Sequence, residues 1–273
     1  SLGRPGLRLL LEGGASRSRP GGALSENNIR LRADTATANA TVLQDFFLGP
    51  TDRITAGVGL DYIFTRAVQE PTPGEPGDPR DDELSLDRMW TSSLTGLYES
   101  EDFLGLNGSM VSGLTVRQGI PGIFDATPGE ADLDNPGLLP SRDDARPENT
   151  QLLFDFDYTQ PLLFADPSLS LRLRGMAQWN RKGSFASDEF SVGGDFGRGY
   201  DGGEISGDAG YALSAEMRYR IARTPPFNVE LQPYAFYDFG YIYNYNQPVG
   251  GRATLASAGV GLDAVYPELG LTL

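Results

Sequence analysis

Residues 189–200 read EFSVGGDFGRGY, and residues 203–210 continue as GEISGDAG. Glycine adopts backbone conformations that other residues avoid, so this density of glycine allows a long loop to fold back compactly on itself. One arginine, Arg198, lies at the tip of the expected loop. A run of alternating apolar and polar residues follows from residue 211, which is typical of a β-strand. The passage therefore predicts a shaped loop that carries one positive charge at its tip and returns into a strand.

Four segments alternate apolar and polar residues with the period of two that a strand between two environments requires. They are residues 152–159, 169–180, 211–221 and 228–241. In the third, one face carries Tyr211, Leu213, Ala215, Met217, Tyr219 and Ile221, and the other carries Ser214, Glu216, Arg218 and Arg220. Charges collect on one face, as a watery lumen requires, whereas a Lys or Arg facing lipid near the midplane costs about 2–4 kcal/mol. The pattern predicts an all-β fold, an antiparallel transmembrane β-barrel.

The remaining strand candidates are weaker, and together with the first four they bring the expected number to about eleven. They cover residues 5–12, 27–46, 53–66, 87–99, 103–118, 253–265 and a last strand from about 270. Short connections are expected near 47–52, 100–102, 162–167, 223–227 and 266–269, and long ones near 13–26, 67–86, 119–148, 181–207 and 244–252. Short turns at one end and long loops at the other are typical of the periplasmic and extracellular ends of an outer-membrane barrel. Arg198 falls on the long-loop side.

Composition excludes several classes of function. The chain has no Cys and no His, which removes thiol nucleophiles, the Ser-His-Asp triad and most zinc sites. A net charge of −15 argues against nucleic acid as a partner, because phosphates demand a basic face. No stretch approaches the ~18 uninterrupted apolar residues of a transmembrane helix. The chain lacks an initiator Met and a signal peptide, so we expect it to be an internal piece of a longer, processed polypeptide.

Other motifs suggest alternatives that the sequence disfavours. Gly197, Gly199 and Gly202 satisfy the dinucleotide fingerprint G-x-G-x-x-G, but a strand follows where that fold needs a helix. The Gly-Gly-Asp and Asp-Gly-Gly-Glu sequences occur once each, without the repeat of a calcium-binding array. Asp155 and Asp157 have the spacing of a glycosidase pair, yet lumen charge is the preferred interpretation.

Two further groups of residues have a simple interpretation on a barrel. The tryptophans Trp90 and Trp179, with Tyr62, Tyr98 and Tyr241, are expected in an interfacial aromatic girdle near the strand ends, and stacking of the two tryptophans on a ligand is the alternative. The acidic, proline-rich loops 67–86 and 119–148 are expected to be solvated surface excursions, with cargo contact outside the cell as the alternative.

The glycine-rich passage resembles the loop that folds into the barrel of outer-membrane polypeptide transporters, F-S-x-G-G-x-x-x-V-R-G-Y/F followed by S-G-D-x-G. The likeness is closest to the two-partner secretion transporters (TpsB, of the haemolysin secretion/activation type), relatives of the assembly factor BamA. A second motif of these barrels, F-x-D-x-G, matches Phe236-Tyr237-Asp238-Phe239-Gly240. The specific likeness is confined to about residues 188–240. The resemblance implies that loop 181–207 enters the lumen and that Arg198 contacts Asp238 on the inner wall.

The resemblance also implies a wider set of site residues. The loop motif comprises Gly193, Gly194, Arg198, Gly199 and Tyr200, its partners on the wall are Asp238, Phe236 and Gly240, and Glu216 and Arg218 are expected neighbours. Gly199 and Gly240 are expected to allow close backbone approach, and Tyr200 to wedge against the wall with its hydroxyl hydrogen-bonded. Gly197 stands where the family prefers Val, which predicts a looser loop tip.

The family likeness carries a function with it. It implies a barrel of sixteen strands in the outer membrane of a Gram-negative bacterium, preceded by POTRA domains that are not found in residues 1–273. If the loop follows the eleventh strand, as in the family, roughly four early strands and the last one lie outside this piece. The barrel, in contact with outer-membrane lipid, is expected to act as a monomer. It secretes an unfolded partner exoprotein without nucleotide hydrolysis, cofactor or enzymatic activity. The alternatives are a BamA- or TamA-like assembly factor, a diffusion porin, and a soluble β-sandwich binding module.

Overall fold

The computed structural model of the chain describes residues 6–19, 31–70, 82–122, 140–163, 166–224, 229–245, 251–266 and 271–272. Within these ranges twelve strands form one sheet with the order β1-β2-β3-β4-β5-β6-β7-β10-β12-β13-β14, and β11 pairs with β12. The strands are β1 (Leu7–Ser18), β2 (Leu31–Leu48), β3 (Asp52–Gln69), β4 (Asp82–Phe103), β5 (Gly108–Gly119), β6 (Thr150–Leu163), β7 (Asp166–Asn180), β10 (Ala209–Tyr219), β11 (Ile221–Thr224), β12 (Val229–Tyr243), β13 (Arg252–Tyr266) and β14 (Leu271–Thr272). Each neighbouring pair in this order is antiparallel, which confirms the predicted all-β antiparallel architecture.

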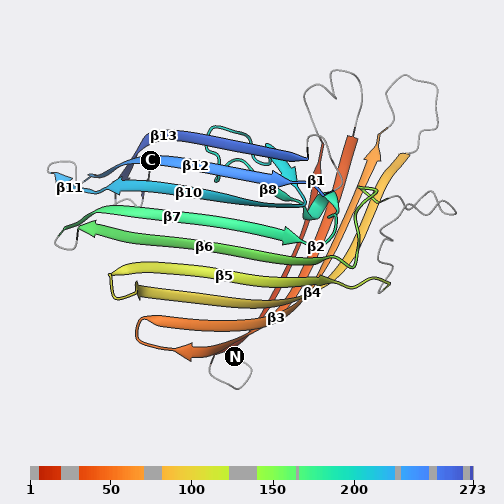
Figure 1. Cartoon of the computed structure of the whole chain (residues 1–273), viewed down its shortest axis with the longest axis horizontal. Helices are drawn as coiled ribbons and strands as arrows, with labels where there is room; N and C mark the ends of the chain where they lie inside the picture. The colour runs from red at the N-terminus through yellow and green to blue at the C-terminus, as the bar shows by residue number, and fades with distance from the viewer. Residues whose placement is uncertain are drawn as a thin grey trace.

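The sheet curves strongly, and the long loop between β7 and β10 lies on its concave side (Figure 1). β1 and β14 lie at opposite ends of the strand order. The described strands therefore form a curved section of barrel wall, not a closed ring.

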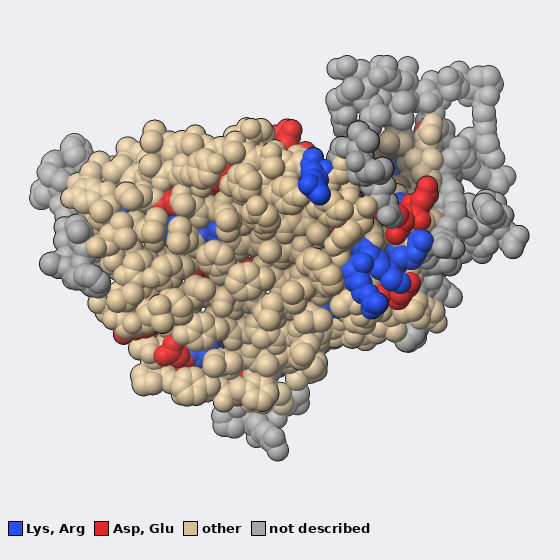
Figure 2. Space-filling view, in the orientation of Figure 1, with Lys and Arg blue, Asp and Glu red and all other residues tan. Residues whose placement is uncertain are grey.

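The predicted alternation is realised in the exposure of the side chains. On β10, Tyr211, Leu213 and Met217 are 42–48% exposed, whereas Ser214 and Glu216 are 3% and 5% exposed. Apolar residues therefore cover the convex face and polar residues turn inward. The face seen in Figure 2 carries few charged side chains over its middle, and charges gather near the long-loop end. This distribution suits a wall with lipid on one side and water on the other.

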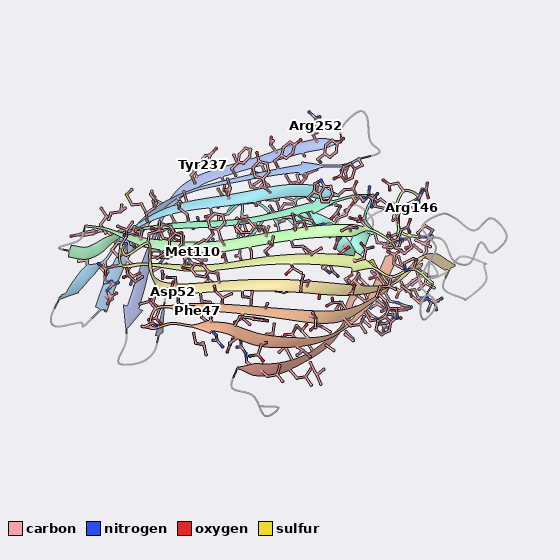
Figure 3. The ribbon with its side chains drawn as sticks, turned by 60° about the horizontal axis from the view of Figure 1, so that its bottom comes forward. Phe47, Asp52, Met110, Arg146, Tyr237 and Arg252 are labelled. Atoms are coloured by element: carbon pink, nitrogen blue, oxygen red, sulfur yellow. The ribbon has the colours of Figure 1, made fainter. Side chains whose placement is uncertain are left out.

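The two ends of the sheet differ as the loop lengths predict. Phe47, Asp52 and Met110 lie at the end with the tight turns, and Arg146 and Arg252 lie at the other end (Figure 3). The expected short turn at 47–52 connects β2 to β3. Residues 71–81 and 123–139, which hold most of the acidic, proline-rich sequence, lie outside the described residues, as do 164–165, 225–228 and 267–270.

Several boundaries differ from the sequence predictions: β3 and β4, for example, extend into the loop expected at 67–86. Residues 13–18 were expected in a loop but continue β1 in register with β2, because Gly13, Gly14 and Ala15 pair normally while showing no visible alternation. The turn expected at 100–102 lies at 104–107, where the Asp102 carboxylate accepts the Asn107 amide at 2.7 Å and closes the turn. The strand expected over 211–221 breaks at Arg220, after which the register with β12 shifts at a bulge.

A small apolar core joins the loop to the concave face. It consists of the buried residues Phe190, Val192, Ala212, Ile242 and Leu255, which come from the loop, β10, β12 and β13. Apolar contact on an otherwise polar inner wall fixes the loop against these three strands. Among the described residues, no helix is long and apolar enough to cross a membrane.

Candidate functional site on the inner wall

The loop has an internal structure that sequence reasoning did not predict. It contains the short 3₁₀ helix η1 (Ala186–Asp188) and a hairpin of β8 (Phe190–Val192) and β9 (Ile205–Gly207). Its tip holds five glycines with positive φ, namely Gly193, Gly194, Gly197, Gly199 and Gly203. The amide of Tyr200 donates to the carbonyl of Gly197 at 3.0 Å, which closes the tip around Arg198. Glycine is needed here because side chains disfavour this backbone region.

Arg198 and Asp238 are in direct contact. The arginine Nε donates to Asp238 Oδ2 at 3.0 Å, and Nη2 donates to Oδ1 at 2.9 Å. The amides of Gly197 and Arg198 donate to the same Oδ2 at 3.3 and 3.1 Å. The Asp238 side chain is 0% exposed and that of Arg198 is 25% exposed. A buried carboxylate thus receives both the guanidinium fork and the backbone of the loop tip, a geometry that favours arginine over lysine.

Two residues of β10 complete the arginine's environment. Nη1 of Arg198 donates to Glu216 Oε2, and Nη2 donates to the Ser214 hydroxyl at 3.2 Å. The guanidinium also lies over the ring of Phe236, 3.5 Å from its centroid. The loop tip is therefore tied to both β10 and β12.

The charges continue along the inner wall. Arg218 Nε donates to Glu216 Oε1, and its Nη1 donates to Asp263 Oδ2 on β13 at 2.8 Å. Glu216 and Arg218, expected as neighbours, thus link the arginine of the loop to a third strand. The structure brings the predicted site residues together, while their role in transport stays a prediction.

The expectation of a loose tip at Gly197 is wrong. Gly197 is buried, has φ of +126° and donates its amide to Asp238. A Cβ at this position would meet Leu255 Cδ2 at 2.4 Å. The absence of a side chain is what allows the tip to dock against β13, so this glycine permits close packing.

Gly240 and Gly199, the two glycines expected to allow close backbone approach, differ in the space around them. A Cβ on Gly240 would meet Val192 Cγ1 at 2.4 Å, so a side chain of the loop packs directly on the backbone of β12 at that point. Gly199 has nothing within 4 Å of a built Cβ, so its expected close approach is wrong and its φ of +100° is the reason for glycine. The Tyr200 hydroxyl donates to the carbonyl of Ala256 at 3.3 Å, although its ring is 44% exposed.

Sequence reasoning missed a second ionic cluster at the root of the loop. Asp208, which is 0% exposed, binds Arg142 from the connection between β5 and β6. Arg142 also binds Glu189 at the other end of the loop. The S-G-D part of the motif pointed to Asp208, but no signal in the sequence pointed to its partner.

A third contact ties η1 to the wall. Arg117 of β5 binds Asp188 through Nη1 and Oδ1 at 2.8 Å, and Gln151 of β6 donates to the other carboxylate oxygen. Burial raises the pKa of the Asp188 carboxyl, and the charge of Arg117 acts in the opposite direction. The loop is thus bound to the wall at its tip, its root and η1.

The alternative chemistries find no support in the described residues. β9 and then β10 follow Gly202, so the glycine fingerprint has a strand where a dinucleotide site needs a helix. Among the residues with described placement, no group of three or more His, Cys, Asp or Glu is arranged to hold a metal ion. Asp157 forms an ion pair with Arg172 on β7, which supports its interpretation as a lumen charge.

Of the aromatic residues expected in a girdle near the strand ends, Trp179 and Tyr241 lie close to the ends of β7 and β12, whereas Tyr62 and Trp90 lie well inside β3 and β4. Trp90 packs on Tyr62 with ring centroids 4.8 Å apart, and Tyr241 packs on Tyr211 at 5.6 Å. Trp179 is 52% exposed one residue from the end of β7. Tyr98 lies at the opposite end and donates to Asp52 at 2.8 Å.

The fold is similar to that of solved outer-membrane proteins. CdiB from Escherichia coli matches with a TM-score of 0.70 and 18% identity over 96% of this chain and 44% of that chain. CdiB from Acinetobacter baumannii matches with a TM-score of 0.68 and 18% identity over 95% and 42%. BamA from Haemophilus ducreyi lacking POTRA domains 1–3 is more distant, with a TM-score of 0.52 and 13% identity over 96% and 57%. The chain thus spans less than half the length of either CdiB structure.

Comparison of the sequence with known protein families and with curated proteins gave one family match. No curated protein matched the sequence. The model of the haemolysin secretion/activation protein family ShlB/FhaC/HecB matches residues 80–264, which include the loop, its wall strands and Asp238. The chain therefore belongs to the ShlB/FhaC/HecB family, which comprises outer-membrane β-barrel transporters of two-partner secretion in Gram-negative bacteria.

Proposed function

We propose that this chain is the barrel of a transporter that secretes a partner exoprotein, of the adhesin or haemolysin type, as an unfolded polypeptide without nucleotide hydrolysis. The observation that carries the proposal is the binding of Arg198 to Asp238 and Glu216, which holds a glycine-rich loop inside the curved wall. Family membership supports the transport class, since the matched region contains both motifs.

In the proposed mechanism, the position of the loop sets the width of the lumen through which the polypeptide passes. Arg198 anchors the tip to β10 and β12, and this anchor sets how far the loop projects into the lumen. Breaking a buried ion pair by removing one partner costs about 3–5 kcal/mol, because the other charge is left without compensation. The anchor is therefore strong enough to define one preferred position of the loop.

The direct test replaces the anchor and measures export. The exoprotein is identified by comparing the proteins secreted by cells with and without the transporter. In Arg198→Ala cells we expect export to fall about tenfold or more, while the amount of heat-modifiable barrel in the outer membrane stays near the wild-type level.

The matched control is Arg172→Ala. Arg172 is also an arginine of the inner wall and is paired with Asp157, but its hydrogen bonds do not reach the loop. Equal loss of export in both variants would indicate a general need for lumen charge. Wild-type export with Arg198→Ala would refute the proposed role of the anchor. Loss of other outer-membrane proteins in place of the exoprotein would indicate a BamA-like assembly function.

A further inference from the structure

The connection between β5 and β6 returns to the wall through residues 140–149, which lie against the root of the lumen loop. We propose that residues 140–149, here named the latch segment, hold both ends of this loop, with Arg142 as the positioning residue. The inference rests on the proposed function, since it concerns how the transporter's loop is released. It assigns a second anchor that is separate in sequence and in space from Arg198 at the tip.

Arg142 binds the loop at two points at once, one before β8 and one after β9. Its Nη1 donates to Glu189 Oε1 at 2.6 Å and to Asp208 Oδ1 at 2.8 Å, and its Nη2 donates to Asp208 Oδ2 at 3.3 Å. Glu189 precedes β8 and Asp208 follows β9, so one guanidinium spans the base of the hairpin. The Arg142 side chain is 15% exposed, which keeps these contacts largely away from solvent.

Asp208 gathers the neighbouring segments around this contact. Its Oδ1 accepts the amide of Ser184 at 2.8 Å, and its Oδ2 accepts the amide of Tyr245 at 2.9 Å. Its own carbonyl accepts the amide side chain of Asn180 at the end of β7. Removal of the Arg142 charge leaves a fully buried carboxylate held by amides alone, which is costly.

The rest of the latch segment contacts the descending part of the loop. The Ser141 hydroxyl accepts the amide of Ala186 at 2.9 Å. Ala145 and Phe185, which are 0% and 1% exposed, pack together with Met89 of β4. The Arg146 amide donates to the carbonyl of Gly183 at 3.2 Å. Hydrogen bonds and an apolar contact therefore run side by side, as in a docked segment that opens and closes as a unit.

The latch lies at the long-loop end of the wall, where Figure 3 places Arg146. This is the end at which an exported polypeptide leaves the barrel, so a displacement of the latch there frees both ends of the loop together. The side chain of Arg198 binds Ser214, Glu216 and Asp238, none of which lies in the latch segment, so such a displacement breaks no contact of the tip anchor. Two anchors of this kind allow the loop to be released in separate steps.

A thiol-accessibility experiment tests the latch without a secretion assay. The chain has no Cys, so one introduced cysteine reports alone. Ser184 is 2% exposed, and Ser184→Cys is close to isosteric. With a membrane-impermeant maleimide added outside the cell, we expect Arg142→Gln to raise the modification rate of this cysteine about tenfold. Arg181→Gln is the matched control, because Arg181 is exposed in the same loop and its side chain binds no other described residue.

A second measurement covers the case in which Arg142→Gln fails to insert. Ser141 Oγ and the backbone nitrogen of Ala186 are 2.9 Å apart, which brings the two Cα atoms within about 7 Å, so Ser141→Cys with Ala186→Cys can form a disulfide. In planar bilayers we expect fewer openings in the oxidised protein and recovery on reduction. Unchanged labelling in Arg142→Gln, or openings insensitive to reduction, would overturn the latch. Neither readout depends on the exoprotein, so failure of the latch is distinct from failure of the secretion proposal.

Discussion

The guanidinium of Arg198 lies 3.5 Å from the centroid of the Phe236 ring, while its edge is bound by a carboxylate two residues further along the same strand. Residues two apart on a strand point to the same side, so β12 alone presents both a flat surface and an acceptor. The ring fixes the plane of the guanidinium and Asp238 fixes its direction. β12 thereby orients Arg198, and Glu216 of β10 adds a further ion pair.

The contact of Arg198 with the Phe236 ring and its ion pair with Asp238 differ in their expected contributions to the free energy of loop docking. A cation–π contact contributes about 0.5–2 kcal/mol, less than the loss of one partner from a buried ion pair. We expect Phe236→Leu to raise the fraction of time that the channel spends open in planar bilayers slightly, and Asp238→Asn to raise it strongly. A larger effect from Phe236→Leu than from Asp238→Asn would contradict this ordering.

Gly197 and Gly199 give a matched comparison within the loop tip. Both have positive φ, which costs a side chain about 1–2 kcal/mol, but only at Gly197 would a Cβ also meet Leu255. We therefore expect Gly197→Ala to reduce hydrogen-exchange protection of residues 190–207 more than Gly199→Ala does. The measurement is exchange followed by mass spectrometry in detergent. Equal loss in the two variants would show that φ alone matters and that the contact with Leu255 is unimportant.

The contact between Gly240 and Val192 predicts a compensating pair of substitutions. Gly240→Ala introduces a methyl group that would lie 2.4 Å from Val192 Cγ1, and overpacking of this kind typically costs about 1–3 kcal/mol. Removal of the valine methyls in Val192→Ala makes room for it. In a double-mutant cycle on the protease resistance of the loop, Gly240→Ala with Val192→Ala is expected to be more resistant than Gly240→Ala alone. Additive losses would contradict the contact.

A Val→Lys substitution made once on each face of the wall tests which face contacts lipid. Val58 is 59% exposed on the convex face, and Val111 is 50% exposed on the concave face, where it pairs with Asp157. We expect Val58→Lys to lower barrel stability by about 2–4 kcal/mol, because a charge then faces lipid. Val111→Lys is expected to have little effect. Urea unfolding of the barrel in lipid vesicles measures both, and equal losses would argue against the assigned faces.

The local patterns in the sequence were sufficient for the wall. Period-two alternation on β10 and β12 placed Glu216 and Asp238 on the polar face, because the direction of a side chain in a strand depends only on its position in that strand. Loop lengths placed the root of the loop that carries Arg198 at the correct end of the sheet. The loop motif and the wall motif, read through the family resemblance, named both partners of the ion pair that the structure contains.

Contacts that depend on the path of a loop required the tertiary structure. Gly197 predicted a loose tip because the family prefers Val at that position. Its φ and its proximity to Leu255 are set by docking of the loop, which leaves no local pattern in the sequence. Arg142 and Asp208 are 66 residues apart, and neither lies in a periodic segment that predicts their meeting. Strand parity in the sequence was enough to assign the apolar and polar faces of β10 and β12, and the family resemblance named the motif residues that pair. The contacts that hold the loop at its root could not be predicted in this way, because they depend on where three separate connections converge in space.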